Sequence, residues 1–371
     1  MDGVDVFKLF ASDFGTVNVF AGERMINMMM MMMMIQDDDE KMMCRQFFFS
    51  FFRRVVSNIV KVKSKSNANF SRKKNRNHKN TMSDDDQQRD EVTFKKLFPG
   101  LQRSGTQIRA PGRPNLRVIC FANAGNAEDL FTNEGLGERR IVSPLLTFCK
   151  NYKAELLSVQ LPGRGSRRNE PWDEPKIQTV IREIAPTLAN ELRDVPYVVV
   201  GHSVGCWLAV QLVDVLKSTY GVNEPLHFSL SNFPAPTIED KDKPWRKNKH
   251  LSEREFQDEC RRWDVQEVVF TGIWKIYHPL MRADFCLFDS YENDLKEKTF
   301  TSDVTAFHGT NDRMISKSMV EKWETMTTGA FALKIVQGGN HLFPLEKESK
   351  IDWLKRIVAV IEAKVMPSIV A

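Results

Sequence analysis

The sequence Gly201–His202–Ser203–Val204–Gly205 places a serine between two glycines, directly after the apolar run Tyr197–Val200 and before a helical pattern that begins at Cys206. A strand, a sharp turn and a helix are what the G-x-S-x-G nucleophile elbow requires. Glycines suit the flanking positions because the serine has strained backbone and side chains beside it would collide with the strand and the helix. Ser203 is therefore the candidate nucleophile, and a serine in an ordinary glycine turn is the alternative.

An aspartate and a histidine follow two later apolar runs, in the order that a catalytic triad needs. Asp312 comes after Val304–His308, and His341 comes after Phe331–Val336. A serine hydroxyl is a poor nucleophile until a base lies within hydrogen-bond reach and a third group orients that base. We expect His341 to be the base and Asp312 to hold its imidazole in the reactive tautomer. The alternative is that His341 is a packed or surface histidine.

The oxyanion that such a reaction creates needs backbone N–H donors. One is expected from Val204, the residue after the nucleophile. The second is expected from the loop Phe121–Gly125, where small residues let the main chain approach a substrate carbonyl. The sequence leaves open whether Ala122 or Asn123 supplies it.

The elements around these residues alternate between strand and helix. Residues 116–122 and 154–161 read as buried strands, and residues 144–152 and 177–192 carry apolar side chains at helical spacing. Strands that alternate with helices predict a mostly parallel sheet flanked by helices. The order Ser, Asp, His at strand ends makes this fold class an α/β-hydrolase, which we expect over residues 111–371.

Residues 233–300, called the lid below, interrupt the alternation between two strands. The segment is charged at first and then rich in large apolar side chains, Trp274 among them. An insertion above the strand ends would cover Ser203, so we expect a helical lid that forms an acyl pocket and places Trp274 against the substrate. The alternative is that these aromatic side chains are ordinary core.

The first 110 residues differ from the rest and are expected to be a low-complexity, disordered extension. They contain a run of seven methionines at 28–34 and a Lys/Arg/Asn/Ser tract at 64–80. Between Lys41 and Ser83 there are twelve Lys or Arg residues and no acidic residue. The protein is therefore expected in the cytoplasm, or in a plastid or mitochondrion if residues 42–82 are a transit peptide.

Composition argues against several other classes of function. Residues 101–371 hold 36 basic and 35 acidic residues, so the basic pI gives no support for nucleic-acid binding. The six cysteines are scattered without C-x-x-C spacing and read as reduced, buried thiols. No metal-ligand cluster, nicotinamide fingerprint or run of eighteen apolar residues is seen, so we expect no metal, no cofactor and no membrane span.

From about Leu116 to Ile361 the chain resembles a type II thioesterase, a stand-alone α/β-hydrolase that serves fatty-acid, polyketide and nonribosomal-peptide synthases. The matching segments, in chain order, are Phe121–Gly125, Val159–Pro171, Gly201–Gly205, Ser231–Pro236, Pro279–Asp284 and Gly338–Phe343. The P-G-R-G-x-R run at 162–167 is the most discriminating, because all related hydrolases share G-x-S-x-G. Departures occur where the family usually has His and Gly, at Asn123 and Asn126, and in an extra loop at 133–140.

The resemblance implies hydrolysis of an acyl thioester on the phosphopantetheine arm of an acyl or peptidyl carrier protein, through an acyl-serine intermediate. Ser203, His341 and Asp312 take the triad roles. Asp284 is a rival for the third role, and its alternative is an ion pair with Arg282 or another basic residue. Arg164, Arg167 and Arg168 could meet an acidic carrier or the phosphate, or could bridge loops.

Other functions use the same residues. An acyl-CoA thioesterase or carboxylester hydrolase would use the same triad on a free substrate, and a non-catalytic α/β-hydrolase would bind a ligand without needing all three residues. We expect a carrier protein or synthase as the partner and a monomeric chain. Acyl length and the identity of the synthase are not written in the residues.

Overall fold

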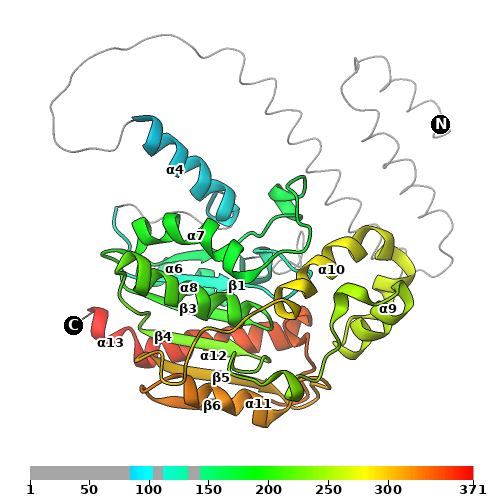
Figure 1. Cartoon of the computed structure of the whole chain (residues 1–371). Helices are drawn as coiled ribbons and strands as arrows, with labels where there is room; N and C mark the ends of the chain where they lie inside the picture. The colour runs from blue at the N-terminus through cyan, green and yellow to red at the C-terminus, as the bar shows by residue number, and fades with distance from the viewer. Residues whose placement is uncertain (1–83, 103–111, 133–142, 371) are drawn as a thin grey trace, which may run out of the picture. The chain divides into compact units, whose positions relative to one another are not determined.

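A computed structural model describes residues 84–102, 112–132 and 143–370, and its centre is a six-stranded parallel sheet (Figure 1). The spatial order is β2-β1-β3-β4-β5-β6, and every neighbouring pair is parallel. The strands are β1 (Arg117–Phe121), β2 (Glu155–Ser158), β3 (Tyr197–His202), β4 (His227–Ser231), β5 (Asp303–Gly309) and β6 (Phe331–Val336). The predicted parallel sheet with flanking helices is confirmed.

Helices cover both faces of the sheet because the strands bury side chains on both sides. Alternate residues of a strand point to opposite faces, and in β3 Val199 belongs to one apolar cluster while Val198 and Val200 belong to the other. The first cluster includes α7 (Ile177–Leu192) and α8 (Gly205–Tyr220), and the second includes α6 (Pro144–Tyr152) and α12 (Lys347–Lys364). The apolar spacing that predicted helices at 144–152 and 177–192 reflects these buried faces.

Several short helical elements lie between the longer ones or, for the last, near the C-terminus. They are α5 (Asp129–Thr132), η4 (Gly165–Arg167), η5 (Asp240–Asp242), η6 (Asn248–His250), α11 (Lys317–Glu321), η8 (Lys322–Met326), η9 (Phe343–Leu345) and α13 (Pro367–Val370). No helix in the described ranges is long and apolar enough to cross a membrane. The five cysteines of these ranges, Cys120, Cys149, Cys206, Cys260 and Cys286, are buried free thiols, as the sequence predicted.

The globular unit begins earlier than the expected boundary near residue 110. Helix α4 (Asp84–Leu97) and the turn η2 (Pro99–Gln102) place Phe94, Leu97, Phe98 and Leu101 in the same apolar cluster as α7. The carbonyl of Leu97 also accepts the Gln160 N–H at 2.8 Å. The boundary prediction is wrong for 84–102 because the apolar residues of this segment are few, lie between Val92 and Leu101, and follow a long polar stretch. Predictions for 1–83, including the transit peptide at 42–82, and for the loop at 133–140 lie outside the described residues.

The lid is helical, as expected. It contains α9 (Glu253–Arg262), the π-helical turn η7 (Val269–Ile273) and α10 (Trp274–Asp289), and Figure 1 shows α9 and α10 together beside the sheet. Its largest aromatic side chains pack inside the protein: Trp263 is 3% exposed and Trp274 is 5% exposed. These rings pack mainly on other aromatic side chains of the lid, and Trp245 packs on Trp207 of α8, so much of the aromatic content is core, which was the alternative to an acyl pocket.

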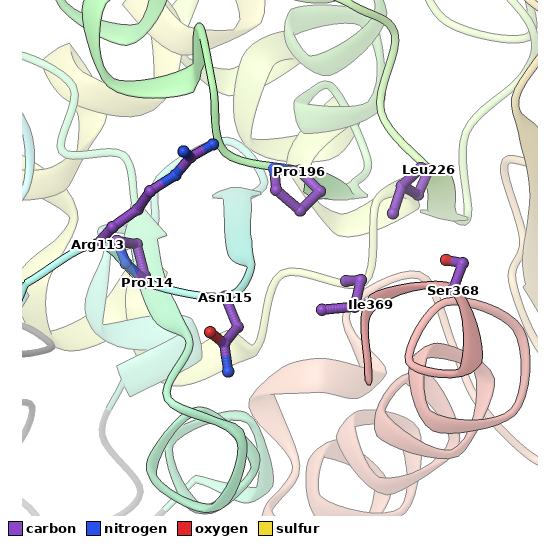
Figure 2. Close-up of a pocket in the computed structure, with 7 residues that line it drawn as sticks. All are labelled: Arg113, Pro114, Asn115, Pro196, Leu226, Ser368 and Ile369. Atoms are coloured by element: carbon purple, nitrogen blue, oxygen red, sulfur yellow. The ribbon is translucent and has the colours of Figure 1, made fainter. Parts of the chain in front are cut away.

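A pocket of about 660 Å³ lies far from the expected chemistry (Figure 2). Asn115, Pro196 and Leu226, which line it, come just before β1, β3 and β4. In a parallel sheet the strand starts share one edge and Ser203 follows a strand end, so this pocket is at the opposite edge of the sheet. The other lining residues are Arg113, Pro114, Ser368 and Ile369.

Candidate active site

Ser203 forms a strained turn between β3 and α8. Its φ of 55° lies in the left-handed region that side chains other than glycine rarely adopt. The neighbouring glycines are required by close backbone approach: a Cβ on Gly201 would lie 2.8 Å from Cys206 Cα, and one on Gly205 would lie 2.8 Å from the Ala122 carbonyl oxygen. The strand, turn and helix that the pentapeptide predicted are all present.

The structure brings Ser203, His341 and Asp312 together from three separate loops. His341 Nε2 lies 2.9 Å from Ser203 Oγ, and His341 Nδ1 lies 2.8 Å from Asp312 Oδ2. Ser203 is 4% exposed and His341 is 1% exposed. Because an ionised carboxylate only accepts hydrogen bonds, Asp312 selects the tautomer with a proton on Nδ1, which leaves Nε2 free to take the serine proton.

Charge in this group is set by burial and by hydrogen bonds. Burial raises the pKa of Asp312, but the charge and hydrogen bond of His341 and two backbone N–H donors outweigh it, so the pKa is lowered overall. Those donors, Met314 and Ile315, both lie 2.9 Å from Asp312 Oδ1. Beside them, burial and the charge of His341 lower the pKa of His202 to about 3. Asp312 is therefore a fixed anion and His202 a neutral neighbour.

Asn232 is a site residue to which the sequence analysis gave no role. It follows β4 with a φ of 48°, and its Nδ2 donates to the Asn340 carbonyl at 2.9 Å. Its Oδ1 accepts the Gly309 N–H at 2.8 Å. Asn232 thus ties the loop of His341 to the end of β5, which leads to Asp312. Its place at a strand end, within the segment Ser231–Pro236, was the available signal.

The expected oxyanion donors lie beside the elbow. Within the described residues, no acceptor is found for the Val204 N–H. The close approach of Ala122 to Gly205 puts the loop Phe121–Gly125, called the first loop below, against the start of α8. This loop is fixed by lid helix α10, because Gly125 donates its N–H to Asp284 at 2.6 Å and its carbonyl accepts from Tyr277 Oη at 2.6 Å. The N–H groups of Val204 and of Ala122 or Asn123 stay the predicted oxyanion donors.

Asp284 forms no hydrogen bond with Ser203, His341 or Asp312. Its carboxylate accepts from Arg164 at 2.5 and 2.7 Å and from Trp172 Nε1 at 2.6 Å, in addition to Gly125. The ion pair that was the alternative to a triad role is therefore present, with Arg164 as the basic partner, whereas Arg282 donates to the His278 ring and to the Asn248 carbonyl. Asp284 is therefore part of a buried ion pair that supports the first loop.

Two of the three arginines expected to bind a carrier or phosphate are unavailable. The Arg164 side chain is 5% exposed and paired with Asp284, and the Arg167 side chain is 2% exposed and paired with Glu170 and Glu183. For these two residues the structure supports the alternative, a structural arginine that bridges segments, because the buried guanidinium groups are paired with carboxylates. Arg168 is exposed and stays a prediction.

Trp274 sits in the lid at the start of α10 rather than at Ser203. Its Nε1 donates to Glu253 at 3.0 Å, and its ring stacks on His278 with centroids 5.0 Å apart. Trp263 is a lid aromatic that contacts the site, with its ring centroid 4.6 Å from that of His341.

The described residues contain no group of three or more His, Cys, Asp or Glu side chains that could hold a metal ion.

A parallel sheet with a serine elbow, and with Asp and His delivered by later strands, defines an α/β-hydrolase. Comparison with known proteins narrows the class. The family model described as "Thioesterase domain" matches residues 147–364. The chain belongs to the thioesterase family and is a thioester hydrolase.

Among three similar proteins, two are named as thioesterases. The chain is 29% identical over 211 residues to linear gramicidin dehydrogenase LgrE of Brevibacillus parabrevis. The match covers 55% of this chain and 75% of that protein. The chain is 28% identical over 237 residues to the human medium-chain S-acyl fatty acid synthase thioesterase, covering 62% and 81%. The solved structure of RedJ, a thioesterase from the prodiginine pathway of Streptomyces coelicolor, is 25% identical with a TM-score of 0.55, covering 69% and 96%.

Proposed function

We propose that this protein hydrolyses acyl thioesters held on the phosphopantetheine arm of a carrier protein, through an acyl-serine intermediate. The observation that carries the proposal is the hydrogen-bonded series from Ser203 Oγ to His341 Nε2 at 2.9 Å and from His341 Nδ1 to Asp312 at 2.8 Å. A nucleophile, a base and a group that orients the base are thereby in contact before substrate arrives.

The first half of the reaction acylates the enzyme. Ser203 Oγ attacks the thioester carbonyl carbon while its proton passes to His341 Nε2, and Asp312 stabilises the imidazolium. The former carbonyl oxygen, now negatively charged, accepts hydrogen bonds from the N–H of Val204 and from that of Ala122 or Asn123. The intermediate collapses with cleavage of the carbon–sulfur bond, and His341 returns its proton to the departing thiolate.

The second half frees the enzyme. A water molecule gives a proton to His341 and attacks the acyl-serine carbonyl. The tetrahedral intermediate then collapses with cleavage of the bond between the acyl carbon and Ser203 Oγ, His341 returns the proton to Oγ, and the carboxylic acid leaves. Both halves balance with water as the co-substrate. The reaction therefore requires no cofactor of the enzyme's own, and the phosphopantetheine belongs to the substrate.

The carrier-bound substrate is supported by what the relatives are named for. The human relative is a fatty acid synthase thioesterase, and RedJ belongs to a biosynthetic pathway. On this chain, Arg168 is exposed in the loop after β2, next to the buried arginines, and could contact the phosphate of an arriving arm.

The test compares an acyl-carrier protein, the matching acyl-CoA and a simple ester of the same acyl group. We expect the highest kcat/KM on the acyl-carrier protein. The Ser203→Ala variant should lose at least about a thousandfold on every substrate, because the remaining oxyanion donors give only a small part of the rate. A preference for acyl-CoA would refute the carrier-bound substrate alone, and an active Ser203→Ala variant would refute the mechanism.

A further inference from the structure

Asp264 connects the lid to the candidate active site. It lies two residues after α9, directly after Trp263, and its side chain is 8% exposed. Its φ of 62° is in the left-handed region, where aspartate and asparagine are the side-chain-bearing residues best tolerated. This backbone conformation turns the chain sharply at the end of α9.

The two oxygens of Asp264 contact both loops that deliver the base and its orienting group. Oδ2 accepts the backbone N–H of His341 at 2.8 Å. Oδ1 accepts from Arg313 Nε at 2.6 Å, and Arg313 is the residue that follows Asp312. A second nitrogen of Arg313 donates to the Arg261 carbonyl at 2.8 Å, so the pair also closes on the end of α9.

The backbone of His341 is therefore fixed from opposite sides. Asn232 donates to the carbonyl of Asn340 at 2.9 Å and more weakly to that of His341 at 3.4 Å, and the Asn311 N–H donates to the Gly339 carbonyl at 2.8 Å. In these bonds, residues at the ends of β4 and β5 donate to carbonyl oxygens of residues 339–341. The lid instead accepts the N–H of His341, through Asp264. A buried N–H without an acceptor is costly, so this donor favours the position in which Asp264 can accept it at 2.8 Å.

We propose that Asp264 is a positioning residue for thioester hydrolysis: it sets the place of His341 so that Nε2 meets Ser203 Oγ. This inference rests on the proposed role of His341 as the base. On this proposal, the end of α9 helps to position His341 in addition to covering the active site. Trp263 assists from the adjacent position, because its ring packs edge-on against the imidazole.

Three substitutions separate the hydrogen bond from backbone strain. Asp264→Ala removes the acceptor and adds strain at positive φ, Asp264→Gly removes the acceptor without strain, and Asp264→Asn keeps an acceptor oxygen at a φ that asparagine tolerates. Arg313→Ala is the matched control, because it removes the partner of Oδ1 and leaves the bond to His341. The Arg313 side chain is 65% exposed, so we expect this variant to stay close to the parent.

The full chain is assayed on an acyl-N-acetylcysteamine thioester, with active enzyme counted by a fluorophosphonate that labels the reactive serine and with the melting temperature measured in parallel. We expect kcat to fall about tenfold to a hundredfold for the Ala and Gly variants, as for a displaced catalytic group. KM should stay within about twofold, and the Asn variant should keep kcat within about threefold of the parent.

Two results would overturn the inference. If the folded Ala and Gly variants turn over at the parental kcat, Asp264 has only a structural role. If Asp264→Asn combined with Arg313→Ala, in which the one amide oxygen has no competing side-chain donor, is as slow as Asp264→Ala, the hydrogen bond to His341 is not what matters. Ser203→Ala distinguishes these failures from failure of the proposed function: an inactive Ser203→Ala beside fully active Asp264 variants rejects Asp264 alone.

Discussion

Replacing Asp284 by asparagine should destabilise the fold far more than it slows the chemistry. The carboxylate is buried and accepts from both terminal nitrogens of Arg164, from Trp172 and from the Gly125 N–H. An amide would point its own N–H₂ at one of these donors and leave Arg164 without a counter-charge. Breaking a buried pair in this way costs about 3–5 kcal/mol, which corresponds to a fall of roughly 5–8 °C in melting temperature for a domain of about 290 residues.

Asp312→Asn is the matched variant and should behave in the opposite way. Its amide oxygen can still accept from Met314 and Ile315, so the fold persists, but the amide nitrogen favours the wrong imidazole tautomer. We expect kcat to fall by about 10⁴-fold. For Asp284→Asn, measured below its melting temperature, we expect less than about a tenfold loss, through the loop of Gly125.

Thioester turnover and thermal unfolding are measured on the same preparations of both variants. The reasoning is refuted if Asp284→Asn abolishes turnover at an unchanged melting temperature while Asp312→Asn remains active. Asp284 would then be the third member of the triad, and α10 would belong to the catalytic machinery.

Three further predictions concern the start of the domain, acid stability and the elbow. Deleting residues 1–82 should leave the melting temperature unchanged, whereas deleting 1–105 removes four buried apolar side chains and should cost several kcal/mol; equal unfolding curves for the two truncations would contradict this. Burial raises the pKa of Asp289 to about 6, above its unfolded value of about 4, so the folded state binds the extra proton and stability should fall as pH rises from about 4 to 6. Asp289→Asn should remove that part of the pH dependence of the unfolding free energy, measured by denaturant titration. The prediction is wrong if the unfolding free energy changes with pH in the same way in both proteins. Gly205→Ala would push a Cβ into the carbonyls of Phe121 and Ala122 and should lower turnover about a hundredfold, so parental turnover would rule out the tight packing.

The sequence was sufficient to predict the strands and the residues at their ends. Runs such as Val198–Val200 are apolar throughout because both faces of a parallel strand are buried, and such runs are recognisable without a structure. Since the carboxyl ends of parallel strands share one edge, Ser203, Asp312 and His341 were expected to meet there, and the structure places them in contact.

Contacts between distant segments were not predictable in the same way. Arg164 and Asp284 are 120 residues apart, and nothing in their local patterns says that the guanidinium is buried rather than free to bind phosphate. Asp264 and His341 are 77 residues apart, and their bond uses a backbone N–H that leaves no mark in the sequence. Helix α4 was missed because its sequence is polar over most of its length, and the two buried apolar residues, Phe94 and Leu97, lie near its end.

Trapping the acyl-enzyme tests the central claim most directly. The protein is mixed with an acyl-carrier protein, quenched in acid within the first turnover and digested for mass spectrometry. The account predicts one acyl group on the peptide that contains Ser203, and no adduct in Ser203→Ala. Full turnover with the acyl group on another residue, or turnover by Ser203→Ala, would contradict it.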